Sequence, residues 1–315
     1  MNFEKSILFS IIIPTFNRAN MISRAIESVI AQTYTNWELI IVNDGSIDNS
    51  EEVVKKYQLK DNRIKYYFQE NKGRSAARNL GIDNSSGEYI CFLDDDDYYF
   101  EDFLYKFYFL IISTSSFGKI LMCRQYELIN DQMIEVKLNE KKLLQNPLKY
   151  LILLSNNLQP FAIPTLLLKH EKFDERFGLG EDFHLLIRLL ISEETVLTNY
   201  FGCVYNNHDS MTMKLELEEL LFLKYKYNRL DMLEDLFNNY NNLLKSNLIL
   251  KDLKKKYNQI AYFYGSICLK KFYLTESLIF RNKIILGDIL SYYFNISLFL
   301  RSLSKQIKCL KIIRN

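Results

Sequence analysis

The sequence contains a short apolar run that leads directly into four acidic residues, Tyr89-Ile90-Cys91-Phe92-Leu93-Asp94-Asp95-Asp96-Asp97. A continuous apolar run of this length is typical of a strand that is buried on both faces of a sheet. Four adjacent carboxylates repel one another, so this arrangement is unstable unless a counter-charge offsets it. A divalent cation that prefers oxygen ligands would supply that charge. The alternative is a solvated acidic turn that caps a helix beginning near Glu101.

The residues that precede this run alternate between two hydrophobic periods. Further apolar runs predict strands, at Ile7–Ile13, Leu39–Val42 and Ile64–Phe68. Apolar residues at helical spacing predict intervening helices, around Ile22–Ile30, Val53–Val54 and Ala76–Ile82. This alternation predicts an α/β fold with a mostly parallel central sheet and flanking helices. Ligands of such sheets bind beyond the carboxyl ends of the strands, which here are Pro14–Arg18, Asn43–Ser46 and Asp94–Asp97.

The rest of the chain divides into two parts that differ in sequence pattern and composition. Up to residue 213 the pattern is mixed, and it predicts a hairpin over Met122–Val136 that turns near Asn130-Asp131, a helix over Gly180–Ile191 and a strand over Val196–Tyr205. The last 102 residues contain no proline and only two glycines, which predicts an all-helical region. We therefore expect an α/β domain over residues 1–213 and a helical C-terminal region over residues 214–315.

The charge balance excludes some classes of protein. The chain has 40 Lys and Arg against 38 Asp and Glu, a net charge of +2, which argues against nucleic-acid binding. A hydrophobic fraction of 48% also excludes a disordered chain. The neutrality is an average of two unlike parts, because residues 1–213 hold 22 basic and 29 acidic residues and residues 214–315 hold 18 and 9.

The cysteines and the longest apolar stretches indicate a cytoplasmic location. The five cysteines are scattered and form no CxxC pair, so the sequence indicates reduced, buried thiols and neither a zinc knuckle nor a disulfide framework. The apolar run at Ile7–Ile13 is too short for a signal peptide and is followed by Pro14. The longest uncharged C-terminal stretch, Ile289–Leu300, is well short of the ~20 residues that span a bilayer.

Two polar segments could contact a ligand. In Asn43-Asp44-Gly45-Ser46, Asp44 could hold the turn through its own hydrogen bonds or accept hydrogen bonds from a nucleotide base. The segment Asn71–Asn79 places a lysine and two arginines at the start of a helix. Free helix N–H groups and cationic side chains can bind an anion, and a solvated basic helix start is the alternative.

Two further segments could carry catalytic groups. Glu181 and Asp182 follow two glycines, Gly178 and Gly180, at the start of a predicted helix. Acidic residues there stabilise the helix dipole, and the alternative is a general base in a glycine-flanked loop. His208 follows the predicted strand Val196–Tyr205. A lone histidine is usually structural, although its imidazole would suit a remaining coordination position of a metal.

These motifs follow one another in a fixed order. They comprise Ser10-Ile11-Ile12-Ile13-Pro14-Thr15-Phe16-Asn17-Arg18, Ala25-Ile26-Glu27-Ser28-Val29, Gln32-Thr33-Tyr34, Trp37-Glu38-Leu39-Ile40-Ile41-Val42-Asn43-Asp44-Gly45-Ser46, Asn71–Gly81, Gly87-Glu88-Tyr89-Ile90 and Phe92–Asp97. Together they resemble the family-2 inverting nucleotide-sugar glycosyltransferases with the GT-A fold. The resemblance is close over residues 7–110 and loose over residues 160–212, and it hardly extends to the last hundred residues.

The resemblance implies roles for individual residues. Phe16 would stack on the nucleotide base, Asp44 would bind the base edge, and Asp94 would lie near the ribose. The full set implied at the donor is Pro14, Phe16, Asn17, Asp44, Arg74, Asp94 and Asp95. The DXD motif falls on Asp94-Asp95-Asp96, where Asp96 would bind Mg²⁺ or Mn²⁺, with the register open by one residue towards Asp95 or Asp97. Asp182 would be the base, and His208 would help to hold the metal or the diphosphate.

The reaction that the resemblance implies fits these residue types. Displacement of a nucleoside diphosphate leaves negative charge that a divalent cation stabilises, and inversion requires one base on the opposite side of the anomeric carbon. We therefore expect a metal-assisted transfer of a sugar to a saccharide or polyprenyl-linked acceptor. The resemblance implies a uridine donor, which is the commonest kind in the family. The alternative is a catalytically silent scaffold of the same fold. No GxxxxGK[ST] or GxGxxG segment is present, so a P-loop or a dinucleotide site is not expected.

The end of the chain is basic. After Asp288 no acidic residue occurs, and Arg301, Lys305 and Lys308 would share one helical stripe. A basic amphipathic helix can lie on an anionic membrane, which would make the protein peripheral to the inner face of the plasma membrane. The alternative is a helix that packs on its neighbours and exposes its basic face to solvent.

Overall fold

The computed structural model describes residues 6–136, 157–178, 180–206, 229–240, 242 and 253–254. The chain falls into two compact units, residues 1–228 and 229–315. The predicted boundary between residues 213 and 214 and most of the predicted helical region lie outside the described residues. The helix α11 (Arg229–Asn239) is the main described element of the second unit. The division at residue 213 therefore stays a prediction.

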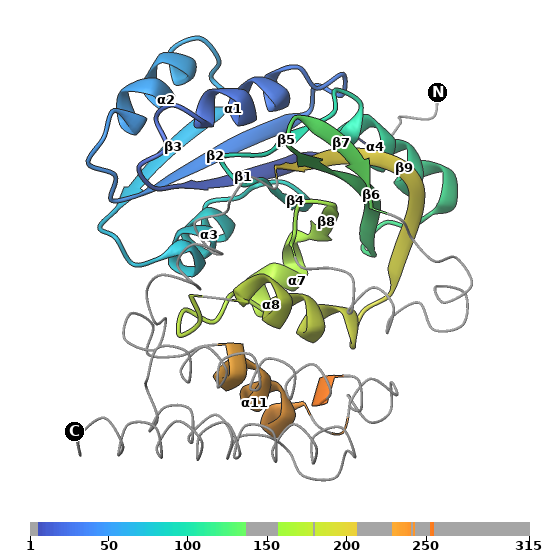
Figure 1. Ribbon diagram of the computed structural model, residues 1–315. Helices are drawn as coiled ribbons and strands as arrows, with labels where there is room; N and C mark the ends of the chain where they lie inside the picture. The colour runs from blue at the N-terminus through green and yellow to red at the C-terminus, as the bar shows by residue number, and fades with distance from the viewer. Residues whose placement is uncertain are drawn as a thin grey trace, which may run out of the picture. The chain divides into compact units, whose positions relative to one another are not determined.

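Four parallel strands form the first half of the sheet, in the order β3-β2-β1-β4. These strands are β1 (Phe9–Thr15), β2 (Trp37–Asp44), β3 (Ile64–Gln69) and β4 (Tyr89–Phe92). They are joined by the helices α1 (Ile22–Ile30), α2 (Ser50–Gln58) and α3 (Arg74–Asp83). The predictions for this half are confirmed. Figure 1 shows α1 and α2 on one face of the sheet and α3 on the other.

The core of this half explains why the apolar runs are continuous. Alternate residues of β1 face opposite sides, and Ile11 and Ile13 join the hydrophobic cluster that includes Ile22 and Ala25 of α1. On the other face, α3 packs closely on Ile12, because a Cβ atom at Gly81 would lie only 2.5 Å from the Ile12 Cγ2 atom. Both faces of β1 are thus buried, as its apolar run predicts.

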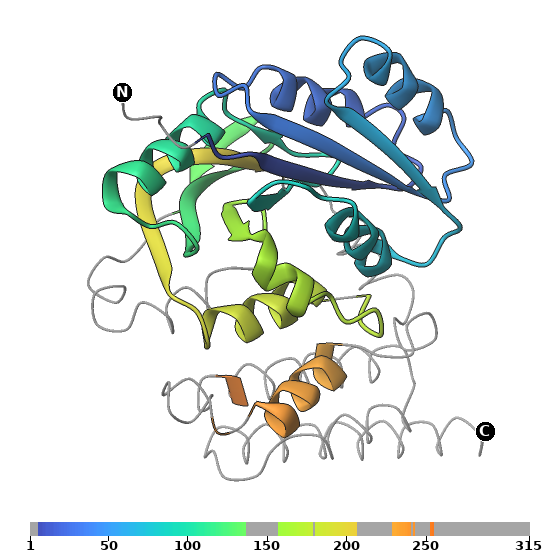
Figure 2. The ribbon, with the colours of Figure 1, turned by 180° about the vertical axis from the view of Figure 1, so that it is seen from behind.

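The second half of the sheet is mixed. It continues the order as β4-β8-β6-β9-β5, and β7 pairs with β6. The strands are β5 (Tyr98–Tyr99), β6 (Ile120–Ile129), β7 (Gln132–Glu135), β8 (Phe161–Pro164) and β9 (Thr195–Asn206). Their helices are α4 (Phe103–Thr114), α7 (Thr165–His170) and α8 (Glu181–Leu190). Figure 2 shows the curl of this half from behind.

The predicted parallel arrangement holds for β3-β2-β1-β4, whereas the second half of the sheet has mixed pairing. Strand β8 is antiparallel to β4 and β6, and β9 is antiparallel to β5 but parallel to β6. Of the described strands, only β6 and β7 are joined by a two-residue turn, a connection that requires antiparallel strands, and the other antiparallel pairs join strands far apart in the chain. The predicted hairpin is confirmed, since Asn130 and Asp131 both have positive φ angles between β6 and β7.

The remaining predictions for helices and strands of the first unit also agree with the structure. The helix expected near Glu101 begins at Phe103, the helix expected over Gly180–Ile191 is α8, and the strand expected over Val196–Tyr205 is β9. Within the part of the chain that the structure describes, no helix is long and apolar enough to cross a membrane.

Candidate functional site

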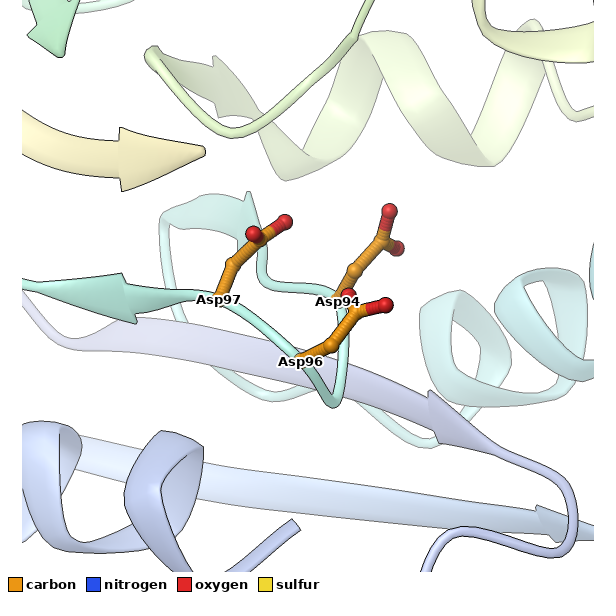
Figure 3. A group of neighbouring side chains, drawn as sticks. All are labelled: Asp94, Asp96 and Asp97. Atoms are coloured by element: carbon orange, nitrogen blue, oxygen red, sulfur yellow. The ribbon is translucent and has the colours of Figure 1, made fainter. Parts of the chain in front are cut away.

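The Asp94–Asp97 loop follows β4 at the carboxyl edge of the parallel strands, as predicted. Its carboxylates alternate in exposure: the side chains of Asp94 and Asp96 are 30% and 18% exposed, whereas Asp95 and Asp97 are buried. Oxygen atoms of Asp94, Asp96 and Asp97 lie within 4.8 Å of one another. Figure 3 shows these three side chains gathered on one side of the loop. The group offers only hard oxygen ligands, which suit Mg²⁺ or Mn²⁺.

Asp95 is not part of this group of three. Its Oδ2 atom accepts a hydrogen bond of 2.7 Å from the Thr15 hydroxyl, at the end of β1. Burial, followed by the charge of Asp96, raises the pKa of Asp95 to about 7. Asp95 therefore ties the loop to β1, next to the predicted donor residues.

Asp97 ties the same loop to the second half of the sheet. Its Oδ1 accepts a hydrogen bond of 2.5 Å from the backbone N–H of Asn206 at the end of β9. Its Oδ2 accepts one from the Gln159 amide, two residues before β8. Burial, with smaller contributions from Asp96 and Asp94, raises the pKa of Asp97 well above its usual range. Both oxygens of Asp97 thus have partners within the protein.

The loops after β1 and β2 are joined to each other. The Asn17 backbone N–H donates to the Ser46 hydroxyl at 2.9 Å, and the Asn17 side-chain oxygen accepts from the Ile47 N–H at 2.9 Å. Asn17 has a φ angle of 54°, and the short amide side chain tolerates this left-handed conformation. Pro14 is partly buried, while Phe16 is 40% exposed. An exposed ring at this edge is available for stacking.

Asp44 binds the segment that precedes α3. Its carboxylate accepts hydrogen bonds from the backbone N–H groups of Lys72 and Gly73, both at 2.9 Å, and from the Gln69 amide at 2.7 Å. The turn after β2 is instead held by Asn43, whose side-chain oxygen accepts a hydrogen bond of 2.8 Å from the Ser46 N–H, so the alternative in which Asp44 holds its own turn is wrong. The bonds of Asp44 place the basic start of α3 beside β2. A contact between Asp44 and a nucleotide base stays a prediction.

The Glu181–Asp182 pair begins α8. Gly180 precedes it with a φ of 78°, a left-handed conformation that glycine adopts without strain. The structure brings this pair to the Asp94–Asp97 loop through Arg78 of α3, whose side chain is 2% exposed. Arg78 pairs with Asp94 at 2.8 Å and with both Glu181 and Asp182 at 3.1 Å. Arg74, one turn earlier, lies 3.5 Å from Glu181.

Asp182 has the electrostatics of a group that exchanges protons near neutral pH. Burial raises the pKa of Asp182, the Arg78 charge opposes this, and the Glu181 charge adds to it, for a pKa of about 7. A buried carboxyl with such a pKa can accept a proton from a bound hydroxyl group. Perturbed pKa values of this kind are common at catalytic sites.

Arg78 belongs to the basic segment Asn71–Asn79 that the sequence indicated, but its contact with both acidic groups was not predicted. Its signal was present, because Arg78 lies four residues after Arg74 on the same face of a helix, and the small residues between them allow close packing. A second missed contact is that between Arg18 and Asp96, at 3.8 Å. His208, by contrast, lies outside the described residues, so its predicted role stays a prediction.

Comparisons with known proteins agree with this geometry. A family model described as "Glycosyl transferase family 2" matches residues 10–158. An uncharacterised glycosyltransferase of Rickettsia typhi is 32% identical over 223 residues, which cover 68% of each chain. The glycosyltransferase GlyA of Streptococcus pneumoniae is 32% identical over 207 residues, which cover 60% of this chain and 29% of that one. The chain spans only 15 to 29% of the length of the first curated relatives that it matches.

Solved structures show the same fold. Residues 1–349 of TarS from S. aureus, in complex with UDP-GlcNAc, match with a TM-score of 0.56 at 18% identity over 88% of each chain. The mannosyltransferase PcManGT from Pyrobaculum calidifontis, in complex with GDP-Man and Mn²⁺, matches with a TM-score of 0.55 at 14% identity. The latter match covers 94% of this chain and 86% of that one.

Proposed function

The chain belongs to glycosyltransferase family 2 and has the GT-A fold, and from this premise we propose that it transfers a sugar, with inversion, from a nucleoside-diphosphate donor to a hydroxyl group of an acceptor. The observation that carries the proposal is the presence of two acidic groups with different surroundings, the Asp94–Asp97 loop and the Glu181–Asp182 pair. The first exposes carboxylate oxygens, and the second contains a carboxyl with a pKa of about 7.

The carboxylates of the loop fit a divalent cation. We assign Asp96 as the principal ligand and Asp94 as its neighbour, because both side chains are partly exposed and their oxygens converge. We keep His208 as a further proposed ligand. A bound Mg²⁺ or Mn²⁺ would act as a Lewis acid that stabilises the charge of the departing diphosphate. The Mn²⁺ in the PcManGT complex supports this choice of metal.

The donor lies, in this proposal, along the edge formed by the ends of β1, β2 and β4. Phe16 stacks on the base, and Asn17 holds the β1 loop against Ser46. Pro14, Asp44, Arg74 and Asp95 complete the proposed donor site, Asp44 and Asp95 by fixing the backbone around it. The UDP-GlcNAc and GDP-Man of the structural neighbours support a nucleotide-sugar donor, of which we favour a uridine one.

Asp182 is the proposed base. Its carboxylate accepts the proton of the acceptor hydroxyl, while the hydroxyl oxygen attacks the anomeric carbon from the side opposite the diphosphate. The bond from the anomeric carbon to the diphosphate breaks as the new glycosidic bond forms, which inverts the configuration. The Asp94–Asp97 loop follows β4, and the Glu181–Asp182 pair begins α8. In this proposal, separate elements therefore carry the group that binds the cation and the group that accepts the proton.

We propose a saccharide or polyprenyl-linked acceptor, and contact of the basic end of the chain with an anionic membrane. The support is the sequence of residues 297–315, which lie outside the described residues. Removal of these residues should release the protein from anionic phospholipid vesicles in a flotation assay. Unchanged vesicle binding by the shortened chain would exclude this surface.

Donor binding and turnover test the central proposal. UDP or GDP together with Mn²⁺ should raise the melting temperature, because a ligand that binds the folded state stabilises it by mass action. One member of a panel of nucleotide sugars should then be converted to its nucleoside diphosphate in the presence of Mn²⁺. A chain that neither binds a nucleotide with Mn²⁺ nor turns over any donor would refute the proposal.

A further inference from the structure

Arg78 joins the two acidic groups, and this contact carries an inference that rests on the proposed function and deepens it. We propose that Arg78 is a positioning residue that couples occupation of the cation site at Asp94 and Asp96 to the placement and charge of the base Asp182. The proposal concerns regulation within the site: the base is held most firmly when the donor and its cation are bound.

The geometry places one guanidinium between carboxylates from two distant parts of the chain. The Nη2 atom lies 2.8 Å from Asp94 Oδ1, and the Nη1 atom lies 3.1 Å from Glu181 Oε1 and 3.1 Å from Asp182 Oδ1. The two ends of the same rigid, planar fork thus contact the two acidic groups. A lysine ammonium is a point charge on a flexible chain and cannot hold both ends in one fixed geometry.

Helix α3 fixes the position of this guanidinium. The Ser75 hydroxyl donates to the Phe177 carbonyl at 2.9 Å, and Asn79 exchanges two hydrogen bonds of 3.0 Å with the backbone of Phe173. The Phe173 ring lies 5.4 Å from the guanidinium carbon of Arg78. These contacts brace the loop before α8 against α3, so a displacement of Arg78 would be transmitted to the Glu181–Asp182 pair.

The charge balance explains how coupling arises. One positive charge on Arg78 is shared by three carboxylates, and Arg74 lies 3.5 Å from one of them, Glu181. A divalent cation at the loop neutralises Asp94, so Arg78 interacts less with Asp94 and more with Glu181 and Asp182. The stronger interaction favours the ionised form of Asp182 in the position set by the fork. By linkage, the base side must affect cation affinity to the same extent.

Arg78 could instead bind the donor directly. The coupling role and the donor-binding role predict different effects of Arg78→Met on the melting temperature. If Arg78 competes with the cation for Asp94, then Arg78→Met should leave unchanged or increase the rise in melting temperature caused by UDP and Mn²⁺. If Arg78 binds the diphosphate, the same change should reduce that rise. The nucleotide shown to bind the wild-type protein, UDP or GDP, is the probe.

The decisive experiment combines this thermal shift with donor turnover in wild type, Arg78→Met and Arg78→Lys. We expect Arg78→Met to lower kcat about 100-fold, the cost of displacing a catalytic group by roughly 1 Å, with the thermal shift retained. Arg78→Lys keeps the charge without the fork and should lower kcat about 10-fold at an unchanged KM for the donor. Arg63→Lys, which alters the Asp61 pair away from the site, is the matched control and should leave all readouts unchanged.

Each other outcome counts against the coupling. Loss of the thermal shift in parallel with kcat would make Arg78 a donor ligand, and unchanged kcat in Arg78→Lys would remove the need for the fork. Arg78→Met removes the guanidinium that three carboxylates share, and if this variant does not fold, Arg78→Lys decides the question by the same two readouts. Failure of the wild type to bind a nucleotide with Mn²⁺ or to turn over a donor would instead refute the proposed function, so the two failures are distinguishable.

Discussion

The Asp94–Asp97 loop and the Glu181–Asp182 pair both concentrate negative charge, but they differ in what balances it. The pair is buried against Arg78 and close to Arg74, so the protein supplies its counter-charge. The loop has four carboxylates, and of these Asp94 contacts Arg78 at 2.8 Å and Asp96 lies 3.8 Å from Arg18. The exposed oxygens of the loop leave room for an external cation, whereas the pair holds its charge without one. The loop thus has more carboxylates than its two arginine contacts offset, together with partly exposed oxygens, and this combination distinguishes it from the pair.

The largest effect is expected at the group that depends on an external cation. Asp96→Ala removes the proposed principal ligand, and donor turnover should fall at least roughly a thousandfold, since a Lewis-acid cation supplies several kcal/mol. The thermal shift with nucleotide and Mn²⁺ should disappear as well. Asp102→Ala, which removes an exposed carboxylate paired with Lys106, is a matched control and should change neither readout. Full turnover by Asp96→Ala would contradict the assignment of Asp96 as the principal cation ligand.

The second effect tests the group that carries its own counter-charge. Asp182→Asn preserves shape but cannot accept a proton, so turnover should fall about 10²- to 10⁴-fold while the thermal shift with nucleotide and Mn²⁺ persists. A parallel loss of binding would contradict the separation of tasks between the loop and the pair.

The pH profile of the wild type should report the same carboxyl. Below its pKa of about 7, Asp182 is protonated and cannot act as a base, so turnover should rise with pH up to about 7 and then level. Glu181→Gln removes a negative charge that raises this pKa, so the rise should move to lower pH. A profile without a rise in this range would argue against Asp182 as the base.

The same comparison shows how much could be predicted from the sequence. The apolar runs predict β1 to β4, and the rule that ligands bind at carboxyl ends of parallel strands brings the Asp94–Asp97 loop to the edge where Phe16 and Asn43 also lie. The acidic start of α8 was recognised, but its contact with Arg78, which links it to the loop, was not. That contact joins residues about a hundred positions apart, and local periodicity carries no information on such pairs.

The second half of the sheet illustrates the same limit. Strand β5 contains only two residues, too few for a periodic pattern, and neither β5 nor the four-residue β8 was predicted. Strand β9 was predicted, but its parallel pairing with β6 was not, and this pairing has irregular register between Met122 and Gln125. Burial and pairing of this kind come from tertiary packing, which overrides local propensity.

A smaller effect should separate the two kinds of aspartate within the loop. Asp97→Ala removes the acceptor for Asn206 and Gln159 and should lower the free energy of unfolding by about 1–3 kcal/mol. Asp97→Asn should cost less, because the buried Gln159 side-chain oxygen has no hydrogen-bond partner among the described residues, so the Gln159 amide can rotate to accept a bond from the new side chain. Urea denaturation would measure both. Equal destabilisation by the two variants would contradict the expected rotation of the Gln159 amide.

The smallest effect concerns a buried acid with an internal counter-charge far from the proposed chemistry. Burial raises the pKa of Glu38, but hydrogen bonds from Lys65, Ser10 and Ser86 outweigh it, so the pKa lies below its usual value of 4.5. An acid with a depressed pKa stabilises the folded state above its unfolded pKa, and this contribution is lost as pH falls through the folded pKa. Glu38→Gln should thus cost about 1 kcal/mol at neutral pH and nothing well below pH 4.5, with turnover unchanged. Glu52→Gln, at an exposed position, is the control and should leave the free energy of unfolding unchanged at either pH. If Glu38→Gln still lowers the free energy of unfolding in acid, packing and not charge holds Glu38 in place.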